Sequence, residues 1–493
     1  PLLKGEVRAE RITVDGQQRP IFDSIFFSRR IYRGDYCKSV QLTIDSTIQF
    51  MIEQELDRAM AENAPVSITA IVMDPTTGEI LAMASRPSYN PNRFWDYPRD
   101  TWKNRAVSFI YEPGSTFKSI VAGAALQEGI VTPNQVFIDP GYVMVSGRRI
   151  QNWNNESHGA VSFTDIVKNS LNTGFAQVGL SLGAERLMHY TRLFGFGERT
   201  GIDLPGEEQG ILFAPDAMRD SDIATTAIGQ SIAVTPLQLV TAMSAIANDG
   251  ILMKPHIVKS IRNADGSIYE ETRPEEVRRV IESVTDKTLT GLLEQVVAAG
   301  GGEKAQVAGY RIAGKTGTAE KINPNGGGYM AGRYIASFCG FAPVEDPRLT
   351  LLVVIDDPSG IYYGGQIAAV SFPNCCVIST LSLPVIPLSD RNRTRRKLPP
   401  RREPVIGWPF LRSSGWMRRK RPCVSKRRDS GSSRQGGASP WGRAGRRIQW
   451  CPGAPPWWCS LRLRRPDVVF GRTAGFDAAC AYGERGAGAF EGA

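Results

Sequence analysis

Residues Tyr111 to Lys118 read Tyr-Glu-Pro-Gly-Ser-Thr-Phe-Lys and lead into the apolar run Ile120 to Leu126. Proline and glycine interrupt regular structure, so the Pro-Gly pair in this stretch is expected to end the preceding segment. A helix is predicted to begin at Ser115, and Gly129 is placed to end it in a left-handed conformation. The stretch therefore predicts a serine in the first turn of a helix.

Ser115 and Lys118 lie one turn apart on this predicted helix, with their Cβ atoms about 5–6 Å from each other. A serine hydroxyl is a poor nucleophile at neutral pH, and a lysine amine can act as its base once burial has lowered the lysine pKa. The N-terminus of a helix also favours the negative charge that develops during acyl transfer. The pair alone is weak evidence, because Ser-x-x-Lys occurs by chance in many chains as a capped helix with a solvated lysine.

Two motifs further along the chain make the pattern specific. Ser170-Leu171-Asn172 has the form Ser-x-Asn, and Lys315-Thr316-Gly317-Thr318 contains Lys-Thr-Gly. With Ser115 and Lys118 they complete, in the expected order, the three-motif set of penicillin-binding serine enzymes. The combination is far more specific than any one of its parts.

The spacing of apolar, turn and cap residues predicts a mixed α/β chain. Glycines inside a strand indicate the close approach of another backbone or of a ligand, which applies to the strand with the Lys-Thr-Gly motif. The expected elements are a helix capped by Asp45, strands at 68–73 and 79–83 around a turn, a helix from Ser162 with Ser170–Asn172 near its end and before Gly174, a helical segment over 275–299, and strands at 311–319, 334–341 and 349–355.

Residues from about 40 to about 369 resemble the transpeptidase domain of a class B penicillin-binding protein. The resemblance implies an α/β (α+β) fold of the penicillin-binding and serine β-lactamase type, with a central antiparallel sheet flanked by helices and a helical lobe. Asn172 and the segment Asp346-Pro347-Arg348 are more similar to the division and sporulation branch than to the elongation branch. Further stretches that carry the resemblance are Asp74–Met83, Glu112–Ser115, Thr235–Leu239 and Ala336–Pro343.

The resemblance assigns roles to the residues of the first two motifs. Ser115 would be the nucleophile, and Lys118 would be the base that accepts its proton. Ser170 would relay protons, and Asn172 would hold the substrate amide. Without the other motifs, Ser170 and Asn172 would be read as polar residues that satisfy carbonyls at a helix end.

The third motif would bind substrate. Lys315 and Thr316 would hold the substrate carboxylate, with Gly317 and Thr318 beside them on the same strand. The edge of this strand would pair with the peptide-like substrate. The backbone N–H groups of Ser115 and Thr318 would form the oxyanion hole.

The resemblance implies a peptidoglycan D,D-transpeptidase that cross-links stem peptides through an acyl-Ser115 intermediate and is acylated by penicillin and other β-lactams. No metal or organic cofactor is implied, and the three histidines (His158, His189 and His256) are expected to be structural. The expected setting is the extracytoplasmic face of the bacterial plasma membrane, with an N-terminal anchor absent from this chain and a membrane glycosyltransferase as partner. Two alternatives stay open, a serine β-lactamase or D,D-carboxypeptidase that passes the acyl group to water, and a non-catalytic β-lactam sensor or scaffold.

Composition divides the chain into two unlike parts. The 493 residues contain 59 Lys and Arg against 49 Asp and Glu, a net charge of +10. Residues 381–493 alone contain 24 basic and 7 acidic residues, which leaves 35 basic and 42 acidic residues before them. Six of the eight cysteines also follow residue 370, so the earlier part carries no disulfide framework.

Three segments are therefore predicted. The resemblance implies that residues 1–40 are the end of an N-terminal pedestal or dimerisation module and that residues 41–369 are the transpeptidase domain. Residues 370–493 would be a disordered Arg-, Pro- and Gly-rich tail, which a frameshift near codon 370 explains best. The basic runs of the tail suggest nucleic-acid or lipid binding and its cysteines suggest zinc, but no histidine or ordered Cys-x-x-Cys pair supports them, and no nucleic-acid partner is expected.

Overall fold

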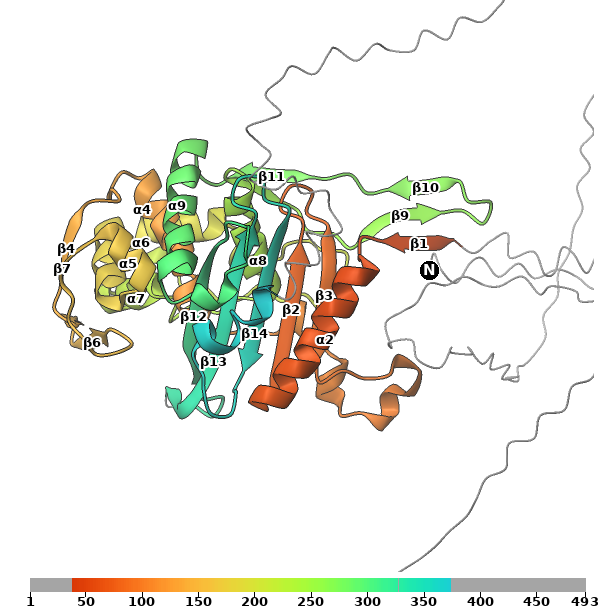
Figure 1. The fold of residues 1–493 in the computed structure, drawn as a ribbon, viewed down its shortest axis with the longest axis horizontal. Helices are drawn as coiled ribbons and strands as arrows, with labels where there is room; N and C mark the ends of the chain where they lie inside the picture. The colour runs from red at the N-terminus through yellow and green to blue at the C-terminus, as the bar shows by residue number, and fades with distance from the viewer. Residues whose placement is uncertain (1–37, 327, 374–493) are drawn as a thin grey trace, which may run out of the picture. The chain divides into compact units, whose positions relative to one another are not determined.

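A five-stranded antiparallel sheet forms the centre of the fold (Figure 1). The computed structural model describes residues 38–326 and 328–373. The strand order is β12-β13-β14-β2-β3, so β12 and β3 form the two edges. This arrangement confirms the predicted antiparallel sheet and its predicted strands. The strands are β2 Ser67–Met73, β3 Ile80–Arg86, β12 Ala313–Ile322, β13 Tyr329–Ala342 and β14 Leu349–Asp356.

Helices cover both faces of the sheet. Helix α2 (Ser46–Asn63) begins after Asp45, whose carboxylate accepts hydrogen bonds from two N–H groups of the first turn, as the predicted cap requires. Alternate residues of β2 pack toward α2 on one face and toward α8 (Pro236–Ala247) on the other. The central strands are therefore apolar on both faces, and the core lies above and below the sheet.

The last described residues close the face of the sheet that α2 covers. Helix α10 (Gly364–Ile367) contacts β12 and β13. Phe372 is fully buried, and its ring meets that of Phe338 edge-to-face at 5.3 Å. The predicted boundary after residue 369 stays a prediction. The predictions for the N-terminal module before residue 38 and for the tail from residue 374, including the frameshift, lie outside the described residues.

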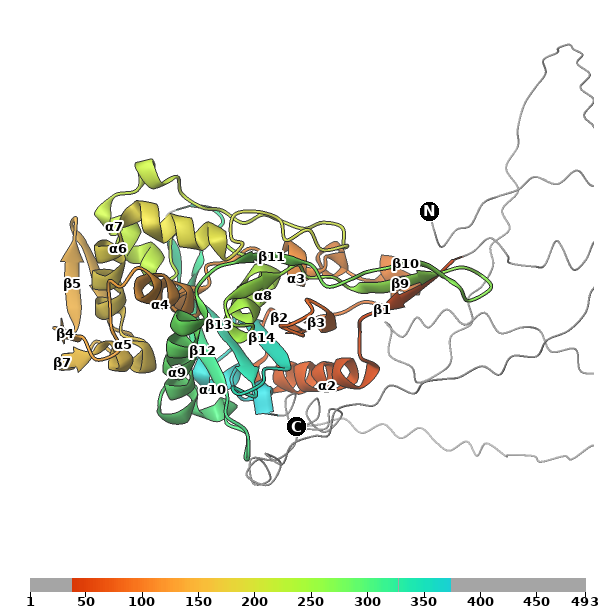
Figure 2. The same cartoon turned by 90° about the horizontal axis from the view of Figure 1, so that it is seen from above.

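A group of helices lies beside the β12 edge of the sheet, as Figures 1 and 2 show. It corresponds to the predicted helical lobe, and α9 joins it to the sheet because it contacts β12 as well as α4 and α5. Two small hairpins, β4 with β7 and β5 with β6, accompany the lobe. The elements are α4 Lys118–Gln127, α5 Phe163–Asn169, α6 Asn172–Leu193, α7 Asp220–Ala227, α9 Ser283–Ala299, β4 Val136–Asp139, β5 Tyr142–Val145, β6 Arg148–Gln151 and β7 Gly159–Ser162.

Part of the segment predicted to be helical at 275–299 forms a strand instead. Residues Glu276–Arg279 form β11, which pairs with β8 (Ile251–Met253), and helix α9 begins only at Ser283. Val277 is the one apolar residue of β11, so this strand depends on its pairing with β8, a neighbour that the sequence does not reveal. The other elements are β1 Ser39–Leu42, β9 Val258–Arg262, β10 Ile268–Glu271, η2 Pro91–Asp96, η3 Arg99–Trp102, α3 Arg105–Ser108, η4 Gly114–Thr116, η5 Pro215–Ala217 and η6 Glu303–Ala305.

Among the helices that the structure describes, none has both the length and the apolar character needed to span a membrane.

Asp286, in the first turn of α9, makes the stability of the fold depend on pH. It is buried, and one of its carboxylate oxygens has no hydrogen-bond partner among the described residues. Burial, and then the charge of Asp249, raise its pKa from 3.8 to about 8. The folded protein therefore keeps a proton that the unfolded chain has released, so stability is lost as the pH rises from 3.8 toward 8.

We expect Asp286→Asn to be more stable than the wild type at pH 9 by at least ~1 kcal/mol, and to show the smaller loss of stability between pH 5 and pH 9. Thermal unfolding at several pH values measures this. Asp220→Asn, at an exposed first-turn position of α7, is the control. Equal pH dependence of the Asp286 variant and the wild type would contradict the prediction.

Candidate active site

Ser115 lies in a short turn of 3₁₀-helix, η4 (Gly114–Thr116), which leads directly into α4. The N–H of Gly114 donates to the carbonyl of Gly229 at 2.9 Å, which fixes the start of the turn. Ser115 is partly exposed to solvent, whereas Lys118, one turn later, is 1% exposed. The structure therefore confirms the predicted serine at a helix start and places the lysine in the interior.

The Ser-x-Asn motif begins at the end of the helix predicted from Ser162, which confirms the place of Ser170, but it also opens a second helix that was not predicted. Helix α5 ends before Ser170, which has a left-handed backbone with φ 58°, and Asn172 is the first residue of α6. Gly174, expected to follow the helix, lies inside α6. A Cβ at this glycine would stand 2.7 Å from the Ile166 side chain, so glycine serves the packing of α6 on α5 and does not end a helix.

The Lys118 amine contacts both polar residues of this motif. Its Nζ lies 2.8 Å from the Ser170 carbonyl oxygen, 2.6 Å from Asn172 Oδ1 and 3.3 Å from Ser170 Oγ. Burial, and then the charge of Lys315, hold the pKa of Lys118 well below its usual range. This environment favours the neutral amine, which is the form that a general base needs.

The hydrogen bonds of Lys118 leave one position free on its nitrogen. A neutral lysine amine has two N–H groups and one unshared electron pair. The Ser170 carbonyl and Asn172 Oδ1 can only accept, so they take both N–H groups. The electron pair is therefore left for a hydroxyl, and the Ser170 hydroxyl at 3.3 Å is the one that it meets in the structure. Within the described part of the chain the Ser115 hydroxyl makes no hydrogen bond, and contacts of this kind often tighten only when substrate binds.

Lys315 approaches Ser170 from the sheet. It is fully buried on β12, and its Nζ lies 2.9 Å from Ser170 Oγ and 3.3 Å from the Thr316 carbonyl oxygen. Burial lowers its pKa from 10.5 to about 7. The Ser170 hydroxyl thus lies between two amines and can pass a proton from one side to the other.

The β12 strand lies against the serine turn. A Cβ on Gly317 would stand 2.9 Å from the Thr116 side chain and 3.0 Å from the Pro113 carbonyl oxygen. Thr318 Oγ1 accepts a hydrogen bond from the N–H of Gly364 at 3.1 Å. Among the described strands β12 pairs only with β13, so no described strand occupies its other edge, which pairing with a peptide requires. All three motifs are therefore close together, although the binding roles of Thr316, Gly317 and Thr318 stay predictions.

We expect Gly317→Ala to push β12 away from the serine turn, because the added methyl group meets backbone as well as side-chain atoms. The variant should lose about 1–3 kcal/mol of stability and at least about tenfold in its rate of acylation by a β-lactam. Gly291→Ala in α9 is the matched control, since a Cβ there meets nothing within 4 Å and should leave the rate unchanged. Equal acylation rates in the two variants would refute the close-approach argument.

Glu112 supports the site, although the sequence assigned it no role. Its carboxylate accepts hydrogen bonds from the Ser231 N–H at 2.7 Å and from the Tyr329 hydroxyl at 3.0 Å, and burial raises its pKa. Tyr329 begins β13, so Glu112 connects the serine turn to the sheet. Its position three residues before Ser115 was the one feature of the sequence that could have indicated this supporting role.

None of the three histidines bonds to Ser115 within the described residues. Nδ1 of His158 lies 2.8 Å from Asp139 Oδ2, His189 contacts the ring of Tyr190, and His256 is buried. The described residues also contain no group of three acidic, histidine or cysteine side chains suited to a metal ion.

A partly exposed serine, a buried amine one turn away and a second lysine on a sheet edge define a serine acyl-transfer site of the Ser-x-x-Lys class. Residues 68–375 match the family described as the penicillin binding protein transpeptidase domain, and the chain belongs to this family. The resemblance seen in the sequence is thereby confirmed.

Several relatives carry functional names. Stage V sporulation protein D of Bacillus subtilis is 42% identical over 334 residues, which cover 67% of this chain and 51% of that protein. The peptidoglycan D,D-transpeptidase FtsI of Escherichia coli is 37% identical over 338 residues, which cover 68% and 54%. The chain thus spans about half the length of the curated relatives it matches.

A solved structure has the same fold. The crystal structure of penicillin binding protein 3 from Mycobacterium tuberculosis aligns with a TM-score of 0.66 at 34% identity, covering 71% of this chain and 81% of that one. That protein has also been crystallised in complex with aztreonam and with ampicillin. The similarity confirms the predicted penicillin-binding type of fold.

Proposed function

We propose that this chain is a serine-type peptidoglycan D,D-transpeptidase that cross-links stem peptides through an acyl-Ser115 intermediate. The observation that carries the proposal is the Lys118 amine, which is buried, has a lowered pKa and gives its N–H groups to two fixed acceptors. A buried amine with a lowered pKa, one turn from a serine hydroxyl, supports the role of Lys118 as the general base. The names of the relatives and the β-lactam complexes of the M. tuberculosis protein support the same activity.

In the first half of the reaction, Lys118 accepts the hydroxyl proton of Ser115, and the serine oxygen attacks the carbonyl carbon between two D-alanines. The N–H groups of Ser115 and Thr318 stabilise the oxyanion in this mechanism. The C–N bond then breaks, and Ser170, whose Oγ lies 3.3 Å from Lys118 Nζ, relays the proton to the leaving amine. D-Alanine departs, and an ester of Ser115 remains.

In the second half, an amine of a neighbouring stem peptide attacks the ester, loses a proton to the base and restores Ser115. Lys315 and Thr316 hold the terminal carboxylate of the first substrate, and Thr318 lies next to them on β12. Burial lowers the pKa of Lys315 to about 7, so its amine is only partly protonated at neutral pH. A substrate carboxylate beside Lys315 favours the protonated amine. The edge of β12 that no described strand occupies pairs with the backbone of the stem peptide.

The biological setting follows from the relatives. FtsI and Stage V sporulation protein D are proteins named for peptidoglycan transpeptidation and for sporulation. For this chain we propose cell-wall synthesis in division or sporulation on the extracytoplasmic face of the plasma membrane. A membrane anchor preceding residue 1 and a membrane glycosyltransferase partner belong to the same proposal.

Time-resolved intact mass of the full chain with benzylpenicillin tests the function. A covalent adduct of one benzylpenicillin that forms and persists is the expected result. An adduct that forms and disappears within minutes would identify a hydrolase of the β-lactamase or carboxypeptidase kind. Cross-linking of stem peptides by the same preparation separates a transpeptidase from a β-lactam sensor, and the absence of any adduct would overturn the proposal.

A further inference from the structure

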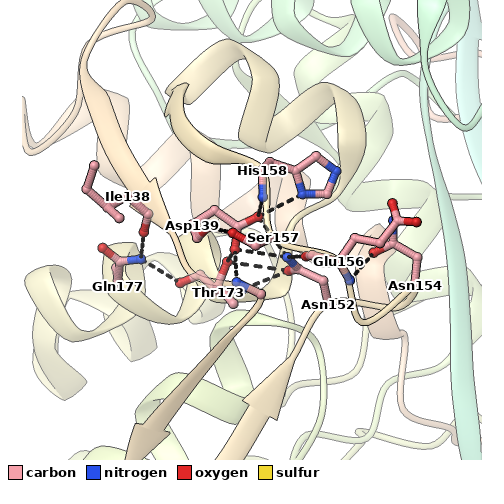
Figure 3. Close-up of polar contacts among 10 residues, drawn as sticks. Ile138, Asp139, Asn152, Asn154, Glu156, Ser157, His158, Thr173 and Gln177 are labelled. Carbon is pink, nitrogen blue, oxygen red and sulfur yellow. Dashed lines mark hydrogen bonds and ion pairs between the residues drawn. The ribbon is translucent and has the colours of Figure 1, made fainter.

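A buried hydrogen-bonded cluster centred on Asp139 lies at the start of α6 (Figure 3). The Asp139 residue is 1% exposed, at the end of β4. The groups that donate to its carboxylate come from the β4–β7 hairpin connection and from α6. They are the Thr173 hydroxyl at 2.7 Å, the Gly141 N–H at 2.9 Å, the Asn152 amide at 2.9 Å, and the N–H and ring Nδ1 of His158 at 3.1 and 2.8 Å.

Two of these donors are also joined to each other. Oδ1 of Asn152 accepts a hydrogen bond from the Thr173 N–H at 3.3 Å, so Asn152 is tied both to Asp139 and to the first turn of α6. Burial acts to raise the pKa of Asp139, but the hydrogen bonds from Thr173 and the other donors outweigh it and lower the pKa. The centre of the cluster is therefore a carboxylate whose charged form is stabilised by the hydrogen bonds that these donors give it.

The cluster residues adjoin a contact of the catalytic motif. Gln151 precedes Asn152, and Asn172 precedes Thr173 in the chain. The Asn172 amide nitrogen donates to the Gln151 carbonyl at 2.8 Å. Because a carbonyl can only accept, this contact requires Asn172 Nδ2 to face Gln151 and Oδ1 to face Lys118.

The orientation of this amide decides what Lys118 can do. With Oδ1 toward the lysine, the neutral amine gives an N–H and keeps its electron pair. With the amide reversed, the Asn172 NH₂ group would face the amine, and only the electron pair of Lys118 could receive it. The base would then be occupied before Ser115 could use it.

We propose that Asp139, Asn152 and Thr173 are positioning residues that hold the Gln151 carbonyl against the Asn172 amide and so keep the electron pair of Lys118 available to Ser115. The inference rests on the proposed function. A cluster that only anchored the hairpin would affect folding and the fraction of competent protein. A positioning cluster also sets the acylation rate constant of each competent molecule.

The test uses Thr173→Val, which removes one buried hydroxyl with almost no change of shape. For the full chain and benzylpenicillin we measure the labelling stoichiometry, the dissociation constant of the initial complex and the acylation rate constant at saturation. Thr173→Val should lower the rate constant about tenfold, with stoichiometry and dissociation constant within about twofold of wild type. Thr173→Ser, which restores the hydroxyl, should return the rate constant to near the wild-type value.

Thr191→Val is the matched control. Thr191 is also fully buried on α6, and its hydroxyl donates to the Leu187 carbonyl at 2.7 Å, outside the cluster. This variant should keep the wild-type rate constant. Equal rate constants in Thr173→Val and Thr191→Val would overturn the inference, as would a defect of Thr173→Val confined to stoichiometry.

A second variant guards against a folding defect in the first. His158→Phe removes one donor to Asp139 from a side chain that is 27% exposed, and should lower the rate constant about threefold. Wild-type rate constants in both cluster variants would overturn the inference while the proposed function stands. A wild-type chain that takes no label would overturn the proposed function, and the inference with it.

Discussion

Ser115→Ala is expected to abolish covalent labelling by benzylpenicillin, with a fall in acylation rate of at least about 10⁴-fold. The variant removes the attacking oxygen and leaves the buried Lys118 and the turn η4 in place. Its folding should be unaffected, because Ser115 is not fully buried and its hydroxyl makes no hydrogen bond within the described residues. Intact mass with time resolution measures the loss, and thermal unfolding confirms the fold.

A neighbouring serine provides the control for this experiment. Ser119, one residue after Lys118, is 1% exposed, and its Oγ has no partner among the described residues. Ser119→Ala should be labelled at the wild-type rate. Persistent labelling of Ser115→Ala at one adduct per chain would place the nucleophile elsewhere.

Lys118→Met is expected to reduce the acylation rate by about 10²–10⁴-fold, the usual contribution of a general base. Methionine fills a similar volume but has no amine. The variant therefore lacks the buried amine, whose charged form is disfavoured at this position. The melting temperature should fall by only a few degrees, because the Ser170 carbonyl and Asn172 Oδ1 lose a donor while no amine has to be buried. Stopped or quenched acylation kinetics with benzylpenicillin measure the loss.

Replacement of a lysine that lies away from the site separates this effect from a general loss of charge. Lys103 is exposed and pairs with Asp100 on the surface, so Lys103→Met should keep the wild-type rate. A Lys118→Met variant that is acylated within about threefold of the wild type would remove Lys118 from the mechanism. Ser170 would then be the remaining route for the proton.

Local signals accounted for much of the fold. Asp45 caps α2, and Gly129 follows α4 with φ +64°, as their residue types predict. Strands β2 and β3 pair as a hairpin, and in the turn between them the Asp74 carboxylate accepts a hydrogen bond from the Thr76 N–H. These features depend on neighbours within a few positions, so one sequence is enough to predict them.

The rest depended on contacts between distant parts of the chain. Asn172 begins a helix because the left-handed Ser170 turns the chain, and nothing in the triplet itself reveals this. Strand β11 forms beside β8, across more than twenty residues. Asp139, in an irregular stretch of sequence, is the centre of a buried cluster only because α6 brings Thr173 to it.

The motif set predicted which residues would meet, because each motif is a short rigid unit with a known chemical role. It did not predict which hydrogen-bond partners the amines of Lys118 and Lys315 would have. The two N–H acceptors of Lys118 and the position of Ser170 between two lysines depend on distances that only the folded chain supplies.

The left-handed backbone at Ser170 has a consequence for how this chain can change. A residue with a side chain at φ 58° is strained by roughly 1 kcal/mol, and glycine would relieve that strain. Yet the hydroxyl at this position links both amines, so the residue best suited to the backbone is the one that the chemistry cannot use. In the proposed mechanism, selection for thermal resistance alone would therefore favour glycine here and remove the hydroxyl that relays the proton.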